Sequence, residues 1–199
     1  TKIEVQLDIQ DEIQGKRTES AIVSNLDKVL KPGVYRHPCV SYGTAVEGYS
    51  ILTELEVGTD GTLTTIQYNF SARDCLPVFA FGGYKGHFSA SVGDISPQGF
   101  AIARILPTQY EEIIFANWYL TLRNASSTAT CGGVWELWVT KDTTGCYGAM
   151  PTEPNYFISG MESSGGIRFS TWTKTVEEAA ALPEPYAIYF PVPSKLIDF

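Results

Sequence analysis

Acidic side chains are the residues of this sequence with the clearest potential for chemistry. Paired carboxylates can hydrolyse a glycosidic bond, with one as general acid and the other as base or nucleophile. Glu136 is distinctive because alternation over residues 134–139 places it on one face with Val134 and Trp138. An acid there is either a glycan-contacting or catalytic feature or an edge-strand charge that prevents aggregation. The other carboxylates considered, most of them at expected turns, are Asp60, Asp74, Asp94, Glu111, Glu112 and Asp142.

Motifs for other chemistries are missing from the sequence. His37 and His87 are the only histidines, and no GxSxG turn supplies a nucleophile for either of them. No GxxxxGK[ST] loop is present to hold a phosphate, and no CxxC pair indicates a zinc site. We therefore expect no catalytic residue, no metal and no cofactor.

The four cysteines leave more than one reading open. Small buried hydrophobic side chains are the simplest interpretation, since free cysteine packs well in cores. Disulfides are the alternative, and a bond between Cys131 and Cys146 would close the loop around residues 141–145. Four cysteines allow three connectivities, among which the sequence does not choose. The other two are Cys39 and Cys75.

Aromatic residues are the best candidates for binding. Tyr42, Tyr84 and Tyr147 each adjoin a glycine, so we expect them in loops, where recognition residues commonly lie. Aromatic rings stack on sugar faces while their polar edges tolerate water. We expect most of the tryptophans in the core. The predicted glycan or partner contacts are therefore Tyr42, Tyr84, Tyr147, Glu136 and Trp138.

Composition limits the class of partner. The chain has 199 residues, 44% hydrophobic, with a formal net charge of -8 and no large cluster of Lys or Arg. Nucleic acids and anionic lipids attract basic surfaces, so we expect neither nucleic acid nor membrane as a partner. No apolar run approaches the length of a membrane span, and the first residues do not follow a signal-peptide pattern.

Many short alternating segments predict a mainly β protein. Asp60-Gly61 favours a tight hairpin between strands at 48–57 and 63–70. The pattern indicates an antiparallel β-sandwich or a jelly-roll-like domain with one or two short helices. Further strands are expected at 34–35, 78–81, 88–92, 100–106, 113–123, 134–140, 156–159, 167–173 and 186–190.

The N-terminal segment predicts a separate arm. Strict alternation over residues 3–9 indicates a strand with no nearby hairpin partner, so we assign 1–17 to an arm or shaft junction. Helical spacing follows in 18–30 and ends at Pro32-Gly33. A second short helix is expected at 175–182, before Pro183. The globular β-rich domain is predicted to cover 18–199.

Residues 26–35, with the sequence LDKVLKPGVY, resemble the opening of knob domains of phage tail fibres and pyocins. Residues 48–52 and 65–68 are similar to the strands that follow in those knobs, and 169–174 to their terminal strand. The resemblance covers about a third of the chain and transfers no binding residue. It implies a virion fibre or tip, usually a homotrimer, which contacts other virion proteins and attaches to a bacterial surface glycan. Such a protein is assembled in the host cytoplasm, where cysteines stay reduced.

Several functions remain in competition. Host-surface attachment by a phage fibre or tip is the first, and a carbohydrate-binding module or lectin is the second. A glycan-cleaving enzyme that uses Glu136 with a turn aspartate is the third. A capsid decoration protein without a receptor role is the fourth, with Tyr42, Tyr84 and Tyr147 at subunit interfaces.

Overall fold

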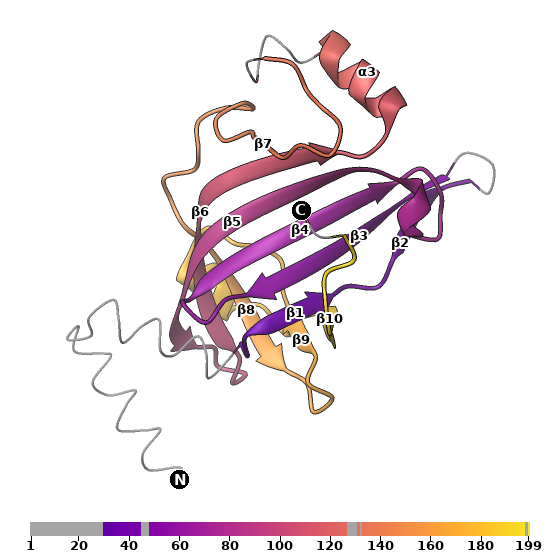
Figure 1. The fold of residues 1–199 in the computed structure, drawn as a ribbon. Coiled ribbons are helices and arrows are strands. Elements are labelled where there is room, and N and C mark those ends of the chain that lie inside the picture. The colour runs from indigo at the N-terminus through magenta and orange to yellow at the C-terminus, as the bar shows by residue number, and fades with distance from the viewer. Residues whose placement is uncertain (1–29, 45–47, 127–130, 132, 198) are drawn as a thin grey trace.

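The protein is a closed barrel of antiparallel β-strands (Figure 1). A computed structural model describes residues 30–44, 48–126, 131, 133–197 and 199. Within these residues, eight strands form the barrel wall. They are β1 (Gly33–Arg36), β3 (Gly48–Val57), β4 (Thr62–Phe70), β5 (Ala80–Ile95), β6 (Ala101–Ile114), β8 (Asn155–Met161), β9 (Ile167–Phe169) and β10 (Ala187–Val192).

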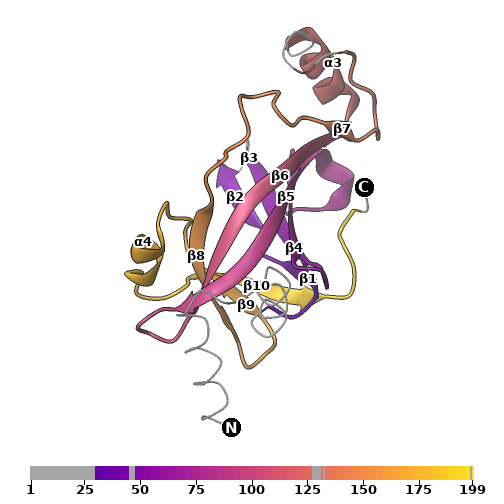
Figure 2. The same ribbon diagram turned by 90° about the vertical axis from the view of Figure 1, so that its left-hand side faces the viewer.

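Five smaller elements complete the fold in the described residues. The short strands β2 (Val40–Gly43) and β7 (Lys141–Asp142) pair with β3 and β6. The helix α3 (Asn117–Ser126) lies beyond one end of the barrel, close to β7 (Figure 1). The helix α4 (Val176–Ala180) lies beside β8 (Figure 2). A 3-10 turn, Pro77–Phe79, precedes β5.

The mainly β, antiparallel character is confirmed, but the expectation of a sandwich or jelly roll is wrong. Strand β1 pairs with β3 on one side and with β10 on the other, which joins the two ends of the sheet. The long strands β5 and β6 bend because their register shifts between His87 and Phe88 and again between Val92 and Asp94. Such bulges increase local twist, and a strongly twisted sheet closes on itself instead of splitting into two layers.

The hairpin predicted at Asp60-Gly61 is confirmed. Gly61 has φ +82°, a left-handed conformation that glycine adopts without steric cost. Asp60 accepts hydrogen bonds from the backbone N–H and the hydroxyl of Thr62. These bonds set the register of β3 and β4, in which Val57 lies opposite Leu63 next to the turn.

The strand expected at 113–123 is wrong beyond Ile114, because the chain turns into α3. Trp118 and Leu122 alternate in sequence as strand residues do, but they are also four apart and therefore share one helix face. Both are exposed. Tyr119 and Arg123 have the same spacing and form the neighbouring face, which turns toward the barrel.

The strand expected at 134–140 is also wrong. Only Leu137 makes a β-bridge there among the described residues, in parallel orientation with Ile114. Trp138 follows with φ +60°, which breaks an extended path. Trp135 is buried and Trp138 is 62% exposed, but neither belongs to a strand.

The barrel interior is the main hydrophobic core. All the wall strands contribute to it, and its buried or partly buried members include Tyr35, Leu55, Leu63, Phe88, Ala103, Ile105, Phe157, Ile167 and Tyr189. A second cluster, which includes Ile66, Tyr68 and Phe70, lies on the opposite face of the strands. The C-terminal residues Leu196, Ile197 and Phe199 pack against that cluster.

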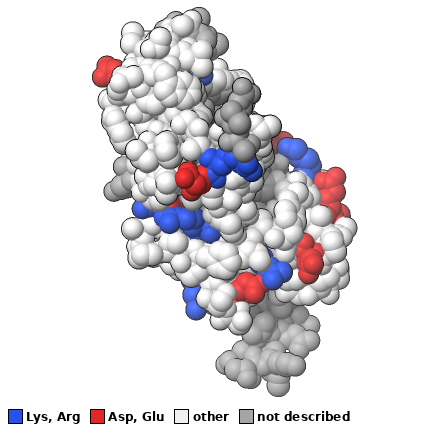
Figure 3. Space-filling view, turned by 90° about the vertical axis from the view of Figure 1, so that its right-hand side faces the viewer, with Lys and Arg blue, Asp and Glu red and all other residues white. Residues whose placement is uncertain are grey.

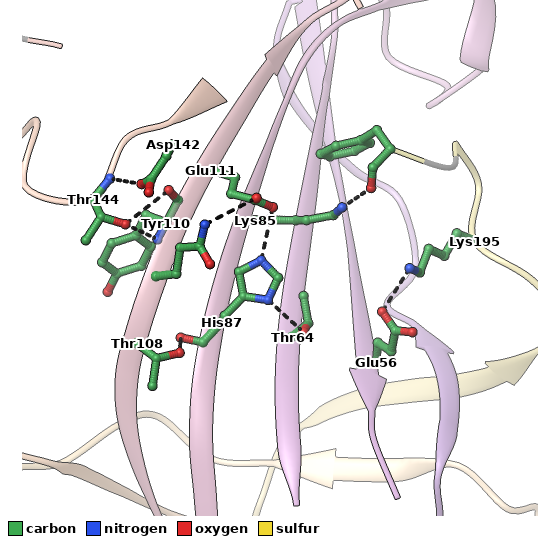
Figure 4. Close-up of polar contacts among 12 residues, drawn as sticks. Glu56, Thr64, Lys85, His87, Thr108, Tyr110, Glu111, Asp142, Thr144 and Lys195 are labelled. Atoms are coloured by element: carbon green, nitrogen blue, oxygen red, sulfur yellow. Dashed lines mark hydrogen bonds and ion pairs between the residues drawn. The ribbon is translucent and has the colours of Figure 1, made fainter. Parts of the chain in front are cut away.

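The outer face also carries polar pairs. The C-terminal segment is held there by Leu196, whose N–H donates to Glu54 at 3.0 Å, and by Tyr68, which donates to the Ile197 carbonyl. Nearby on the wall, His87 lies between Thr64 and Glu111 (Figure 4). The helix α4 covers Ile102 and Ile158 on another part of the outer wall.

The cysteines form disulfides and are not free thiols as the simplest interpretation had them. Cys39 bonds to Cys75, which ties the segment before β2 to the one after β4. Cys131 bonds to Cys146, the pair that the sequence offered as an alternative. No cysteine is left unpaired.

Some expectations lie outside the described residues. The predicted arm at 1–17 and almost all of the helix predicted at 18–30 belong to them. The helix predicted at 175–182 is confirmed as α4, where Thr175 and Glu178 form a reciprocal capping box. Among the helices described, none combines the length and hydrophobicity that crossing a membrane requires.

Candidate functional site: a tyrosine cluster around a buried ion pair

The candidate site begins with one acidic residue on the inner face of β6. Glu112 lies directly opposite Tyr84 on β5, and Tyr84 lies opposite Gln67 on β4. Two residues before Glu112, Tyr110 packs against the interior core, which places this alternating set inside the barrel. The Glu112 side chain has no exposed surface.

The helix α3 supplies the partner of this carboxylate. Arg123 donates to Glu112 Oε2 at 2.7 Å, and its side chain is only 14% exposed. One turn earlier on the same face, Tyr119 donates to Glu112 Oε1 at 3.3 Å. The Tyr119 hydroxyl also lies 2.8 Å from that of Tyr84. Two elements of the barrel and one helix thus meet at a single carboxylate.

The loop after β7 adds a third tyrosine. Tyr147 donates to Glu112 Oε2 at 3.1 Å, and its hydroxyl also accepts from Arg123. The Arg123 guanidinium lies 4.7 Å from the ring centroid of Trp135, whose backbone is bonded in turn to Asn124 of α3. We call Tyr84, Glu112, Tyr119, Arg123 and Tyr147 the tyrosine cluster.

Burial and hydrogen bonding shift the ionisation of the tyrosine cluster. Burial raises the pKa of Glu112, while Arg123 and the two phenols that donate to it oppose that shift. Burial also raises the pKa of Tyr84, with the Tyr119 hydrogen bond and the Glu112 charge adding to it. The pKa of Arg123 is raised, because its bonds to Tyr147 and the Glu112 charge outweigh burial. The phenols are therefore neutral near neutral pH, and Arg123 stays charged beside Glu112.

A cavity of about 250 Å³ lies beside the tyrosine cluster. Tyr147 belongs to both, because its ring lines the cavity while its hydroxyl bonds to Glu112. The remaining lining residues are Tyr110, Thr143, Gly145, Gly148, Ala149 and Met150. We call this space the tyrosine cavity.

The loop that forms one wall of the tyrosine cavity is tied to β6. The Thr143 N–H donates to the Tyr110 carbonyl at 2.8 Å, and the Tyr110 N–H donates to the Thr144 hydroxyl at 2.9 Å. Asp142 accepts from the Thr144 N–H in turn (Figure 4). The bond between Cys131 and Cys146 fixes the loop immediately before Tyr147. The wall is therefore pre-formed, as in most small-ligand sites.

The structure brings together two of the five predicted contact residues. Tyr84 and Tyr147 both belong to the tyrosine cluster. The expectation that Tyr84 lies in a loop is wrong, since it lies within β5, and Tyr147 alone of the three is in a loop. Tyr42 lies on β2, where its ring stacks on Tyr49 with centroids 5.0 Å apart.

The other two predicted residues lie apart from the tyrosine cluster's contacts. Glu136 is exposed, in the stretch between Trp135 and the Leu137 bridge. Trp138 packs on Phe115, with ring centroids 4.8 Å apart, next to the outer cluster that the C-terminal segment covers. The predicted pairing of Glu136 and Trp138 on one strand face is wrong because no strand forms there.

Sequence reasoning missed the importance of Glu112, Tyr119, Arg123 and Tyr110. Glu112 was among the candidate carboxylates, but its neighbours in sequence gave no sign of a buried partner. The available signal is its place in a long strand of largely apolar residues that ends at Ile114. A buried carboxylate there requires a cation, and Arg123 is the first one that follows it.

Fold and site together define a class: a small antiparallel β-barrel with an aromatic cavity at one end. No protein-family model matches the sequence. No curated protein matches it either. In the part of the chain that the structure describes, no three His, Cys, Asp or Glu residues gather as metal ligands would.

Proposed function

We propose that this protein is a recognition module that binds a saccharide in the tyrosine cavity and carries out no catalysis. The observation that carries the proposal is the hydrogen bond between the Tyr147 hydroxyl and the fully buried Glu112. This bond holds an aromatic ring in a fixed place at a cavity wall. Sugar-binding sites combine such rings with a few polar groups.

The ion pair at the centre supports a functional role. Burying a charged pair is often neutral or unfavourable for stability compared with a well-packed apolar pair of similar volume. A fold that needed only a core could place apolar residues at positions 112 and 123. The pair instead orients Tyr119 and Tyr147, so its cost is offset by the positioning of groups at the cavity.

A glycan screen of the intact chain tests the proposal. We expect binding to a subset of immobilised saccharides, and we expect Tyr147→Ala to abolish it with the far-ultraviolet circular dichroism unchanged. The matched control is Tyr186→Ala, which removes an exposed tyrosine that belongs neither to the tyrosine cluster nor to the cavity lining. Saccharide binding that survives Tyr147→Ala would place the site elsewhere and refute the proposal.

The disulfides bear on where such a module works. Both cysteine pairs are bonded, and disulfides persist in oxidising compartments or on exposed surfaces. This supports a location on the outside of a cell or particle and counts against folding in a reducing cytoplasm. The disulfides count only against the cytoplasmic assembly that the virion-fibre resemblance implies, and the lining of the tyrosine cavity is the reason a sugar-binding module ranks first.

Attachment of a phage fibre or tip remains the second candidate, and exposed apolar side chains favour it. Trp118, Leu122, Trp138 and Val139 are each at least half exposed. Contacts between subunits would remove such side chains from water. Light scattering of the purified chain tests this candidate: a stable trimer that binds bacterial cells would support it, and a clean monomer would remove its main structural expectation.

A further inference from the structure

The tyrosine cavity has a chemical character that narrows its ligand. None of its seven lining residues carries a formal charge, and five of them are Gly, Ala, Met or Thr. We infer that the cavity takes an uncharged sugar ring and discriminates against acidic sugars such as uronates. This inference rests on the proposed function and specifies the class of ligand that the same site binds.

Electrostatics argues against an anion in the cavity. A buried carboxylate without a partner is strongly unfavourable, so an acidic ligand needs a cation to receive it. The nearby cation, Arg123, already donates to Glu112 at 2.7 Å and also bonds to Tyr147. An incoming carboxylate would therefore meet a neutralised pair, one member of which repels it. The net charge of -8 adds long-range repulsion.

Few charged side chains lie at the upper end of the face displayed in Figure 3, and most gather across its middle and lower parts. Asp142, close to the cavity wall, is an acid, and its carboxylate accepts the Thr144 N–H. Asp142 thus places an acid one residue before Thr143 of the cavity lining, with the same sign of charge as a uronate.

The size and walls of the cavity suit a single ring. A volume of about 250 Å³ is below the roughly 300–1,000 Å³ of sites for drug-sized ligands. Among the described residues, Tyr110 and Tyr147 are its aromatic lining residues, and the glycines at 145 and 148 add no side chain to the lining. An aromatic ring offers a sugar ring a flat apolar face, which matches the largely apolar lining of the cavity.

Tyr147 is prepared for this contact. It is 65% exposed overall, although its hydroxyl is bonded to a carboxylate with no exposure. An exposed tyrosine ordinarily samples several rotamers, and fixing one of them on binding costs conformational entropy. The bond to Glu112 removes much of that cost in advance. Glu112 and Arg123 are thus positioning residues, and Tyr147 is the contact.

Matched pairs of sugars test the inference directly. Titration calorimetry of the intact wild-type chain compares methyl glycosides of glucose, galactose and mannose with those of the corresponding uronates. Within each pair only the group at the sixth carbon changes from a hydroxymethyl to a carboxylate. We expect at least one neutral glycoside to bind and its uronate to bind about tenfold more weakly or worse, equivalent to about 1.4 kcal/mol.

Variants separate contact from positioning. We expect Tyr110→Ala and Tyr147→Ala to lose the neutral glycoside, and Tyr147→Phe to weaken it severalfold by releasing the ring from Glu112. Tyr186→Ala should leave binding unchanged. If the hydrogen bond to Glu112 anchors the ring, the ring of Tyr147→Phe is mobile. NMR of that ring therefore provides a readout that a simple loss of stability would not change.

The outcome of the titrations shows which of the two proposals is wrong. Equal or tighter binding of the uronate overturns the inference about charge while it leaves the saccharide-binding proposal standing. Absence of binding to every saccharide, with the fold intact, overturns both. A preference for the neutral glycoside over its uronate that persists in Tyr147→Ala and Tyr110→Ala also overturns the inference. The discrimination would then arise outside the tyrosine cavity.

Discussion

The Arg123 guanidinium lies 2.7 Å from the Glu112 carboxylate, and this pair joins a helix at the end of the barrel to the barrel's inner wall. The two residues are only 11 apart in sequence, but they belong to different elements. Removal of one partner leaves a buried charge without compensation. The same pair also sets the direction of two phenols, so its loss affects both stability and binding.

We expect Arg123→Ala to lower the free energy of unfolding by about 3–5 kcal/mol, as for other broken buried pairs. Chemical denaturation monitored by tryptophan fluorescence measures this. Arg104→Ala, at an exposed position on β6, is the control and should stay within about 0.5 kcal/mol of wild type. The double variant Glu112→Gln, Arg123→Met should recover much of the loss. An Arg123→Ala protein as stable as wild type would show that the pair is solvated.

The buried phenols predict instability in alkali. Burial raises the pKa of Tyr84 and of Tyr119, so both stay protonated in the folded chain after unfolded tyrosine has begun to ionise at about pH 10. Their contribution is therefore complete below about pH 10 and is lost as the pH rises further. Unfolding free energy should fall in that range, and less steeply in Tyr84→Phe. If the unfolding free energies of the wild type and Tyr84→Phe fell equally with pH, the prediction would be contradicted.

The disulfides should differ in what their removal costs. Replacement of both Cys39 and Cys75 by Ala should lower stability by about 2–4 kcal/mol, because the bond closes a loop with a sequence separation of 36 and anchors buried Cys75. Replacement of Cys131 and Cys146 should chiefly weaken saccharide binding, since that bond fixes the loop beside Tyr147. Thermal unfolding and calorimetric titration of both double variants measure the contrast. Equal effects of the two double variants on saccharide binding would contradict this prediction.

The capping box of α4 gives a small and well-defined prediction. The Thr175 hydroxyl accepts from the Glu178 N–H at 3.1 Å, and the Glu178 carboxylate accepts from the Thr175 N–H. Thr175→Ala should cost about 1 kcal/mol. Thr171→Ala, an exposed threonine outside the helix, is the matched control. Equal midpoints of denaturation for the two variants would show that the cap contributes nothing.

Local chemistry made parts of this fold predictable from sequence. Asp60 and Gly61 determine the turn of their hairpin, and Thr175 with Glu178 determines a helix start, so both were predicted correctly. Trp118 and Leu122 fit strand and helix periodicity equally over a short span, and α3 was missed. Barrel closure depends on β1 meeting β10 across most of the chain, which no local pattern encodes.

The candidate site was predictable only in part, for a related reason. Tyr84 and Tyr147 were selected because each adjoins a glycine, and they belong to one cluster because both reach the surroundings of Glu112. The pairing of Glu112 with Arg123 was not predicted, because Arg123 was assigned to a strand. The direction of its side chain was therefore unknown. Trp138 and Glu136 were selected from an alternation that the left-handed backbone of Trp138 interrupts.

The position of β1 has a consequence for synthesis of the chain. This strand is among the first parts of the described structure to leave the ribosome, but one of its two neighbours, β10, ends at Val192. Until that late segment emerges, β1 and β9 each present an unpaired edge. Open edges can pair with other chains, so the growing polypeptide is most exposed to aggregation just before its final strand arrives.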